Sequence, residues 1–146
     1  MAGPQGPFGA FNFLVDIQNV VQANFAEVDG LEIDVAAIEY REGGDKGLGA
    51  RKLPGLAKFP NIVLKRGFTS DISLWKWFQS VLSGQVQRTT VAITLLDSQR
   101  QPVVRWLARE AWPCKYAGSE LNAQGNDVAI ETLEICHEGL ERVAVA

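Results

Sequence analysis

The stretch GGDKGLGARK at residues 43–52 contains the residue types from which phosphate-binding loops are built. Such a loop needs a glycine, four residues and then Gly-Lys followed by serine or threonine, because backbone N–H groups and the lysine surround the phosphates. Here no lysine directly follows a glycine, and no serine or threonine comes next. The dinucleotide-binding pattern also fails, since Gly47 and Gly49 are correctly spaced but Lys52 replaces the third glycine. We therefore expect no nucleotide cofactor.

His137 is the only histidine, so any catalytic triad would depend on it. No segment resembles the nucleophile elbow that such a triad uses. Cys136 precedes it, but neighbours in a strand point to opposite faces and make a poor metal pair. The other cysteine is Cys114, and nothing in the spacing of the two requires a disulfide, so we expect free, buried thiols. We expect no enzymatic activity and neither a metal nor a cofactor.

Carboxylates are frequent, and most fit the solvated faces of strands. If several copies of the chain turned them toward a shared channel, the acidic wall would repel nucleic-acid backbones without any chemistry. The carboxylates considered are Glu27, Asp29, Glu32, Asp34, Glu39, Glu131, Glu134 and Glu138.

The composition is that of an ordinary folded domain. The chain has 146 residues, of which 47% are hydrophobic and 21% charged, with a formal net charge of −3. That charge argues against nucleic acid as the main partner, because dedicated binders show a basic balance or face. The first residues do not resemble a signal peptide, and no apolar run is long enough to span a membrane. We expect synthesis in the cytoplasm.

Period-two alternation of apolar residues predicts strands in most of the chain. After Ala36–Ala37 the alternation changes parity, which predicts a β-bulge and a curved strand suited to a barrel or a twisted sandwich. The elements predict a mainly antiparallel β domain with one packed helix. The expected strands cover residues 11–17, 25–42, 61–68, 88–97, 102–110, 112–118 and 128–143.

One helix is expected at about residues 71–83. Its apolar side chains lie on one stripe, which fits either the core or a subunit contact. Ser70 or Asp71 can cap its start, and Gly84 can end it in the left-handed conformation. The stripe consists of Leu74, Trp75, Trp77, Phe78, Val81 and Leu82.

Two segments lack a regular pattern. Residues 1–10 hold three glycines and two prolines and are expected to form a flexible arm, followed by one domain over 11–146. Residues 42–60 are expected to be a long, basic, glycine-rich extended loop. Loops of this length in compact domains are usually functional or disordered, so a merely mobile surface loop is the alternative.

Several segments, in this order, resemble the inner tube protein of contractile phage tails and bacterial contractile injection systems. Each motif alone is weak, but the ordered set is specific and extends over about residues 11–142. The segments are FAEVDGLE (25–32), EYREGG (39–44), KLPG (52–55), NIVLKRG (61–67), LWKWF (74–78), RWLAREAWPCKY (105–116) and LNAQGNDVAIETLEICHEGLER (121–142).

The resemblance implies a non-enzymatic structural subunit with two packed antiparallel sheets in a barrel-like sandwich and a helix alongside. Such subunits form hexameric rings that stack into a hollow tube inside a sheath. Partners would be other copies of the chain, sheath subunits, baseplate and terminator or cap proteins, and cargo in the lumen. Neither specific nucleic-acid binding nor membrane insertion is expected. Assembly would occur in the cytoplasm, and the particle could later be extracellular.

In this family the long loop reaches neighbouring subunits between rings. Its basic residues would meet acidic groups on the next ring, and Leu53, Pro54 and Leu56 would fill a pocket. The expected inter-subunit residues are Glu42, Gly43, Gly44, Lys46, Arg51, Lys52, Leu53, Pro54, Gly55, Leu56 and Lys58. The candidate lumen or interface charges are Glu32, Asp34, Arg105, Arg109, Glu131 and Glu134.

Two alternatives remain open from the sequence. One is a monomeric ligand-binding β-barrel, which needs an apolar cavity within one chain. The other is a minor tube paralogue at the baseplate rather than the main tube protein. The sequence does not separate a phage from a free or membrane-anchored injection system.

Overall fold

The computed structural model describes residues 12–44, 47–119 and 129–145. Within these ranges the chain forms strands and one helix, which confirms the mainly antiparallel β class. The elements are β1 (Phe13–Ile17), β2 (Val21–Phe25), β3 (Glu27–Asp29), β4 (Asp34–Tyr40), β5 (Arg51–Lys58), β6 (Ile62–Gly67), α1 (Ser73–Leu82), β7 (Thr89–Leu96), β8 (Pro102–Gly118), β9 (Ile130–Cys136) and β10 (Gly139–Val143). The expected arm at residues 1–10 and the turn at 120–127 lie outside the described residues.

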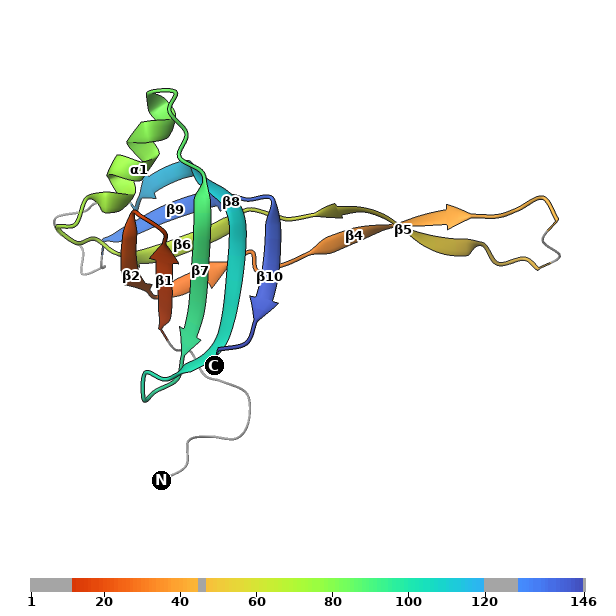
Figure 1. Ribbon diagram of the computed structural model, residues 1–146, viewed down its shortest axis with the longest axis horizontal. Helices are drawn as coiled ribbons and strands as arrows, with labels where there is room; N and C mark the ends of the chain where they lie inside the picture. Colours follow the sequence, from red (N-terminus) through yellow and green to blue (C-terminus); the bar gives the residue numbers. More distant parts are fainter. Residues whose placement is uncertain (1–11, 45–46, 120–128, 146) are drawn as a thin grey trace.

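Two antiparallel sheets form the body of the molecule and share strand β8 (Figure 1). The first sheet runs β2-β1-β7-β8, with β10 also pairing with β8. The second sheet runs β8-β9-β6-β3. The backbone N–H of Ala26 donates to the carbonyl of Lys65 at 3.0 Å, where the ends of the two sheets approach. The result is an open barrel-like sandwich rather than a closed barrel.

Strand β8 is one continuous element of 17 residues, whereas the sequence predicted two strands separated at Ala111. Pairing with β7 shifts register between Val91 and Thr89, and Glu110 takes a left-handed φ of 53°. A second shift against β9 lies between Pro113 and Lys115. Bulges bend a strand without ending it, so β8 turns from the first sheet into the second.

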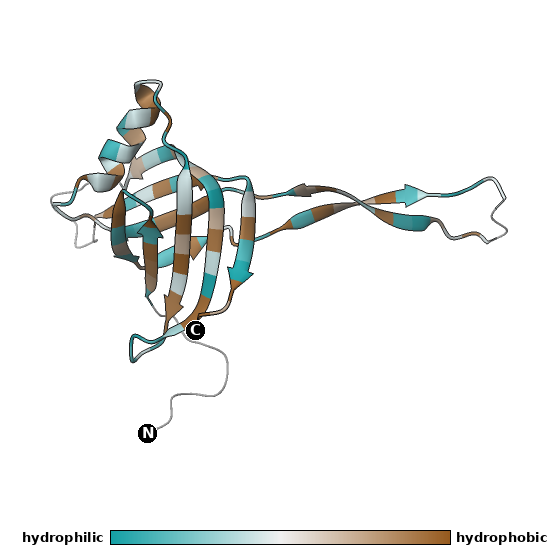
Figure 2. Cartoon of the chain, in the orientation of Figure 1, coloured by the Kyte–Doolittle hydropathy of each residue, from teal (hydrophilic) through white to brown (hydrophobic). Residues whose placement is uncertain are grey.

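The core lies between the two sheets and follows the expected alternation. Val15 pairs with Ile93 across β1 and β7, and both side chains are fully buried. In the second sheet Leu64 pairs with Leu133, again fully buried. Figure 2 shows the same alternation as hydrophobic and hydrophilic bands along the strands of the body. These interdigitated aliphatic side chains fill the space between the sheets.

Helix α1 packs beside β8 and is slightly shorter than predicted. Leu74 and Trp77 are buried, while Trp75 is 38% exposed and meets Tyr116 edge-on at a ring-centroid distance of 5.3 Å. The stripe is therefore divided, because Leu74 and Trp77 belong to the core while Trp75 and Leu82 are exposed. Gly84 follows the helix with a φ of 81°, which confirms the predicted left-handed ending.

The start of α1 is stabilised by Asp71. The backbone N–H and the hydroxyl of Ser73 donate to its Oδ1 at 3.0 and 2.6 Å. These bonds, with smaller contributions from Arg66 and Lys76, hold the pKa of Asp71 below its ordinary value, against a small opposing effect of burial. A carboxyl with a lowered pKa contributes stability that is present above its unfolded pKa and is lost as the pH falls through its folded pKa.

We expect Asp71→Ala to lower the free energy of unfolding by about 1 kcal/mol at neutral pH, because a donor at the helix start loses its acceptor. The difference from the wild type should shrink as the pH falls below about 4, since protonation weakens the same bonds. Urea unfolding of both proteins, at neutral pH and at low pH, measures this difference in the free energy of unfolding. An unchanged difference at low pH would assign the loss to packing instead of charge.

The single strand predicted over 25–42 is wrong. It is divided into β3 and β4 by a turn at Gly30, which has a φ of 90°. A Cβ at Gly30 would lie only 2.1 Å from the carbonyl oxygen of Asn61, so both the conformation and the space require glycine. Strand β2 was missed although Val21, Ala23 and Phe25 alternate. The last predicted strand is also two strands, β9 and β10, separated at His137 and Glu138.

Gly30→Ala and Gly84→Ala form a matched pair of substitutions. Both residues have a positive φ, but a Cβ at Gly84 meets nothing within 4 Å. We expect Gly84→Ala to cost about 1 kcal/mol from the left-handed conformation alone, and Gly30→Ala at least about 2 kcal/mol because backbone must also move. Chemical denaturation compares the two. Equal losses would contradict the role of the Asn61 contact.

Candidate functional site

Strands β4 and β5 form a separate two-stranded sheet that projects from the body as an arm (Figure 1). The sequence predicted an extended loop over residues 42–60, and this is wrong for Arg51–Lys58, which form β5. Pro54 and Gly55 are uncommon in strands and interrupt the strand pattern in the sequence. Proline is tolerated here because β5 is an edge strand with only one neighbour. We call β4, β5 and their connection the β4–β5 arm.

The β4–β5 arm contains the irregularity that the parity change predicted. Val35 pairs with Ala57 and Ala37 pairs with Pro54, so the register shifts at Ala36. The extra residue lies on β5, opposite the position where the sequence suggested it. At this bulge a Cβ on Gly55 would lie 3.0 Å from Cδ1 of Ile38, so the Ile38 side chain packs over the glycine.

Opposite charges face each other across the arm. Glu39 pairs with Lys52, and Asp34 pairs with Lys58. Cross-strand pairs of opposite charge stabilise a two-stranded sheet modestly. Lys52 and Lys58 therefore already have acidic neighbours within the chain, whereas the sequence interpretation directed them only to another subunit.

The arm has no cover within the described part of the chain. Every residue of β4 is exposed, and so is every residue of β5 except Gly55, which is half-buried. Ile38 and Leu53 pair directly across one face and are 52% and 47% exposed, and Leu56 is 82% exposed. Figure 2 shows these apolar bands along the arm. An isolated two-stranded sheet is marginally stable in water, and large exposed apolar surfaces are uncommon on monomeric proteins.

The remaining predicted arm residues lie at its distal end. Gly43 and Gly44 have open space around them, and Glu42 accepts a hydrogen bond from Tyr40 Oη at 3.3 Å. Arg51 lies opposite Tyr40. Lys46 lies outside the described residues.

The six candidate lumen or interface charges do not form one group. Glu32 and Asp34 are exposed at the base of the arm. Arg105 and Arg109 are exposed on β8, and Nη2 of Arg109 lies where a Cβ on Gly139 would be only 2.8 Å away. Glu134 on β9 accepts a hydrogen bond from Asn61 Nδ2 at 3.3 Å on the outer face of the second sheet.

The prediction that Glu131 lines a lumen or an interface is wrong, because its side chain is only 4% exposed. This glutamate pairs with the buried Arg66, whose Nη2 lies 3.5 Å from its Oε1. The same nitrogen lies 4.0 Å from Asp71 at the start of α1, and the guanidinium sits 5.3 Å from the ring centre of Phe25. The sequence carried a signal for this pair. Arg66 continues the parity of Ile62 and Leu64, which point to the core.

His137 has a structural environment. Its Nε2–H donates to the carbonyl of Pro60 at 3.1 Å, and its ring lies 5.8 Å from that of Phe59. It thus fixes the turn between β9 and β10 against the chain that leaves the arm. Among residues 12–44, 47–119 and 129–145, no three histidine, cysteine or acidic side chains are placed to hold a metal ion. No helix in these ranges is long and apolar enough to cross a membrane.

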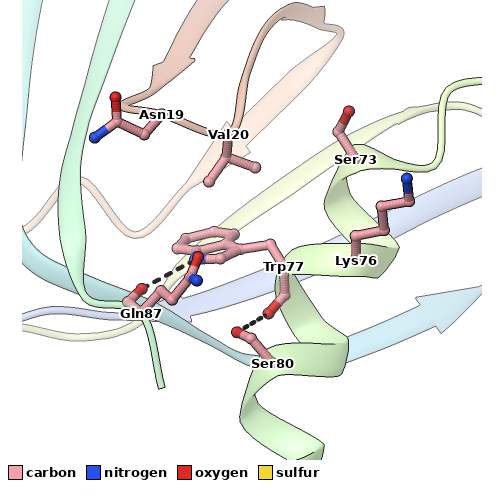
Figure 3. Close-up of a pocket in the computed structure, with 7 residues that line it drawn as sticks. All are labelled: Asn19, Val20, Ser73, Lys76, Trp77, Ser80 and Gln87. Carbon is pink, nitrogen blue, oxygen red and sulfur yellow. Dashed lines mark hydrogen bonds between the residues drawn. The ribbon is translucent and has the colours of Figure 1, made fainter. Parts of the chain in front are cut away.

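A surface cleft of about 320 Å³ lies between α1 and the turn after β1 (Figure 3). Trp77 forms its floor, and the indole N–H donates to the carbonyl of Gln87 at 3.0 Å. The Ser80 hydroxyl donates to the Trp77 carbonyl at 2.6 Å. These polar groups are paired within the chain, and the cleft is outside the core between the sheets. It does not resemble the interior cavity that a ligand-binding barrel requires.

Residues 9–141 match the model of the family described as T4-like virus tail tube protein gp19. The chain belongs to that family. As a tail tube protein, it has a structural role.

Solved tube proteins share the whole fold. A chain of an extracellular contractile injection system, the PVC sheath–tube complex in its extended state, is 26% identical with a TM-score of 0.82, over 97% of this chain and 94% of the other. A chain of the anti-feeding prophage (AFP) baseplate is also 26% identical, with a TM-score of 0.77 and 99% of both chains covered.

A more distant structure supports the fold alone. Hcp1 from Flavobacterium johnsoniae is 12% identical to this tail tube protein, with a TM-score of 0.56 over 90% of this chain and 94% of the other. None of the curated proteins matches the chain.

Proposed function

We propose that this tail tube protein is the subunit of the inner tube of a contractile particle, forming hexameric rings that stack into a hollow tube. When the sheath contracts, the tube would be driven into the target and conduct cargo. The observation that carries this is the β4–β5 arm, whose apolar residues are exposed on both strands. A head-to-tail contact closes into a ring where its rotation closes, and stacked rings extend it into a filament.

The arm supplies the contact between rings in this proposal. Leu53 and Leu56 would enter the neighbouring subunit. Lys52 and Lys58 would stay opposite their acidic cross-strand neighbours and influence the orientation of the arm in the contact. The remaining described residues of the arm's distal end, Glu42, Gly43 and Gly44, would lie at the distal contact. Arg105 and Arg109 on the outer surface of β8 would face a neighbour or the lumen.

The partners follow from the matched structures, which come from sheath–tube, baseplate and tube-cap assemblies. We propose sheath, baseplate and terminator proteins as partners of this chain, and residues 11–146 as one tube domain. Assembly would take place in the cytoplasm where the chain is made. The role is non-enzymatic, in agreement with the structural function of the family.

Electron microscopy of negatively stained, purified protein tests the proposal. We expect rings or tubes at high concentration, alone or with baseplate partners. Monomers only, under both conditions and with the native circular dichroism spectrum, would overturn it. A monomer that carries bound lipid would instead support the ligand-binding barrel.

A further inference from the structure

The two cysteines, which are far apart in the sequence, lie on neighbouring strands of the second sheet. Trp112 of β8 pairs with Cys136 of β9, and Lys115 pairs with Glu134. The register shift between these pairs leaves Cys114 as the extra residue of a bulge. Cys114 is therefore held beside Cys136 by the ladder itself and not by a flexible loop.

Both thiols lie on the outer face of this sheet. Pro113 and Ile135 pair with each other, and both are fully buried on the core side. Their neighbours Cys114 and Cys136 accordingly point away from the core, since successive strand residues alternate between faces. Both cysteines are free and half-buried, so a small reagent can reach them.

The Cys114 sulfur lies in a polar setting at this surface. Its Sγ donates to the carbonyl of Glu134 at 3.5 Å, and Asn61 Nδ2 donates to it at 3.6 Å. Burial, followed by a hydrogen bond with the Cys136 side chain, raises the pKa of Cys114 to about 12. A thiol with a pKa this high remains protonated at neutral pH.

We propose that Cys114 and Cys136 are a disulfide-forming site that links β8 to β9 when the protein meets a small-molecule disulfide such as oxidised glutathione. One cysteine thiolate attacks the small disulfide, forms a mixed disulfide and releases one glutathione. The second thiolate attacks the protein sulfur, forms the Sγ–Sγ bond and expels the other glutathione. The protein loses two protons and two electrons, which reduce the small disulfide to two thiols.

The link would fasten the bulge of β8 between Pro113 and Lys115 to the neighbouring strand β9. It closes a covalent loop over residues 114–136, which restricts the unfolded chain and stabilises the folded one. Because the thiolate is the reactive form, a protonated Cys114 makes the reaction slow at neutral pH and faster at alkaline pH. The site is consequently suited to slow oxidation outside a reducing compartment, unlike a rapid redox sensor.

Mass spectrometry of the wild-type protein after incubation with oxidised glutathione tests the site. We expect a product lighter by two hydrogen atoms, a tryptic peptide that joins Cys114 to Cys136, and a melting temperature higher by about 5 °C. Cys114→Ser and Cys136→Ser should each take up one glutathione and show no such rise. Dithiothreitol should return the wild-type melting temperature to its starting value.

Two outcomes would overturn the inference. One is a wild-type product that carries two glutathione groups with no internal bond. The other is a product that joins different chains, which would place the thiols at an intermolecular contact. Neither outcome depends on whether the protein forms tubes, so the test stands apart from that of the proposed function.

Discussion

Replacing Glu131 with glutamine should lower the free energy of unfolding by about 3 kcal/mol, the largest loss we expect from one charge change. Glu131 and Arg66 are 4% and 6% exposed, and Nη2 of Arg66 lies 3.5 Å from Oε1 of Glu131. Among the residues that the structure describes, neutralising Glu131 leaves the buried guanidinium with the partly exposed Asp71, at 4.0 Å, as its remaining ion-pair partner. An uncompensated buried charge is costly because the interior cannot solvate it.

The exposed pair of Arg88 and Glu138 provides the matched control. Its N···O distance of 3.1 Å is shorter than that of the buried pair. Glu138→Gln should nevertheless cost less than about 1 kcal/mol, because water screens the exposed pair. Equal losses in urea unfolding would show that burial of the Arg66 pair adds nothing.

A double substitution separates the pair from its surroundings. Arg66→Met with Glu131→Leu removes both charges and keeps apolar volume in the core, so we expect it to recover most of the stability lost in Glu131→Gln. A double variant as unstable as Glu131→Gln would instead assign the loss to the shape of the site.

Replacing Leu53 with aspartate should abolish tube formation while leaving the subunit folded. Leu53 is 47% exposed and pairs with Ile38 on one face of the arm, outside the core between the sheets. A charge placed there costs the free subunit less than about 0.5 kcal/mol, but it would be buried without a partner in an assembled contact. Electron microscopy for tubes, with circular dichroism for the fold, measures both effects.

Leu82→Asp is the control for this change. Leu82 is 65% exposed at the end of α1, away from the arm. Tubes should persist in this variant. Trypsin offers a second readout, since cleavage after Arg51 and Lys52 should occur in the free subunit and in Leu53→Asp but not in wild-type tubes. Loss of the native spectrum in Leu53→Asp would contradict an arm that lies outside the core.

Much of the body was predictable because its strands each have one buried face. Because Val15, Ile17, Val91 and Ile93 are buried, apolar residues alternate with more polar ones along these strands. The helix was predictable for the same reason, since its stripe and Gly84 are local signals. Strand pairing, however, is not local, so the sharing of β8 by two sheets could not be derived from the alternation.

The candidate site was harder to predict than the body. In β5, Pro54 and Gly55 interrupt the period, and both faces are exposed, so burial left no pattern in the sequence. β8 appeared to be two strands because bulges change parity in the same way as a chain break. Glu131 was placed on a solvated face because its partner Arg66 is distant in the sequence, although both occupy core positions of their strands.

Strand β8 has a mechanical consequence. Two sheets joined only by packing can slide or separate under load, one weak contact at a time. Here the peptide chain from Pro102 to Gly118 passes through both sheets, so force applied to one reaches the other through covalent bonds. Along β8 the hydrogen bonds to β7 and β9 share that load in shear, which resists rupture better than peeling. The two sheets therefore cannot separate completely unless β8 loses its hydrogen bonds to one of them.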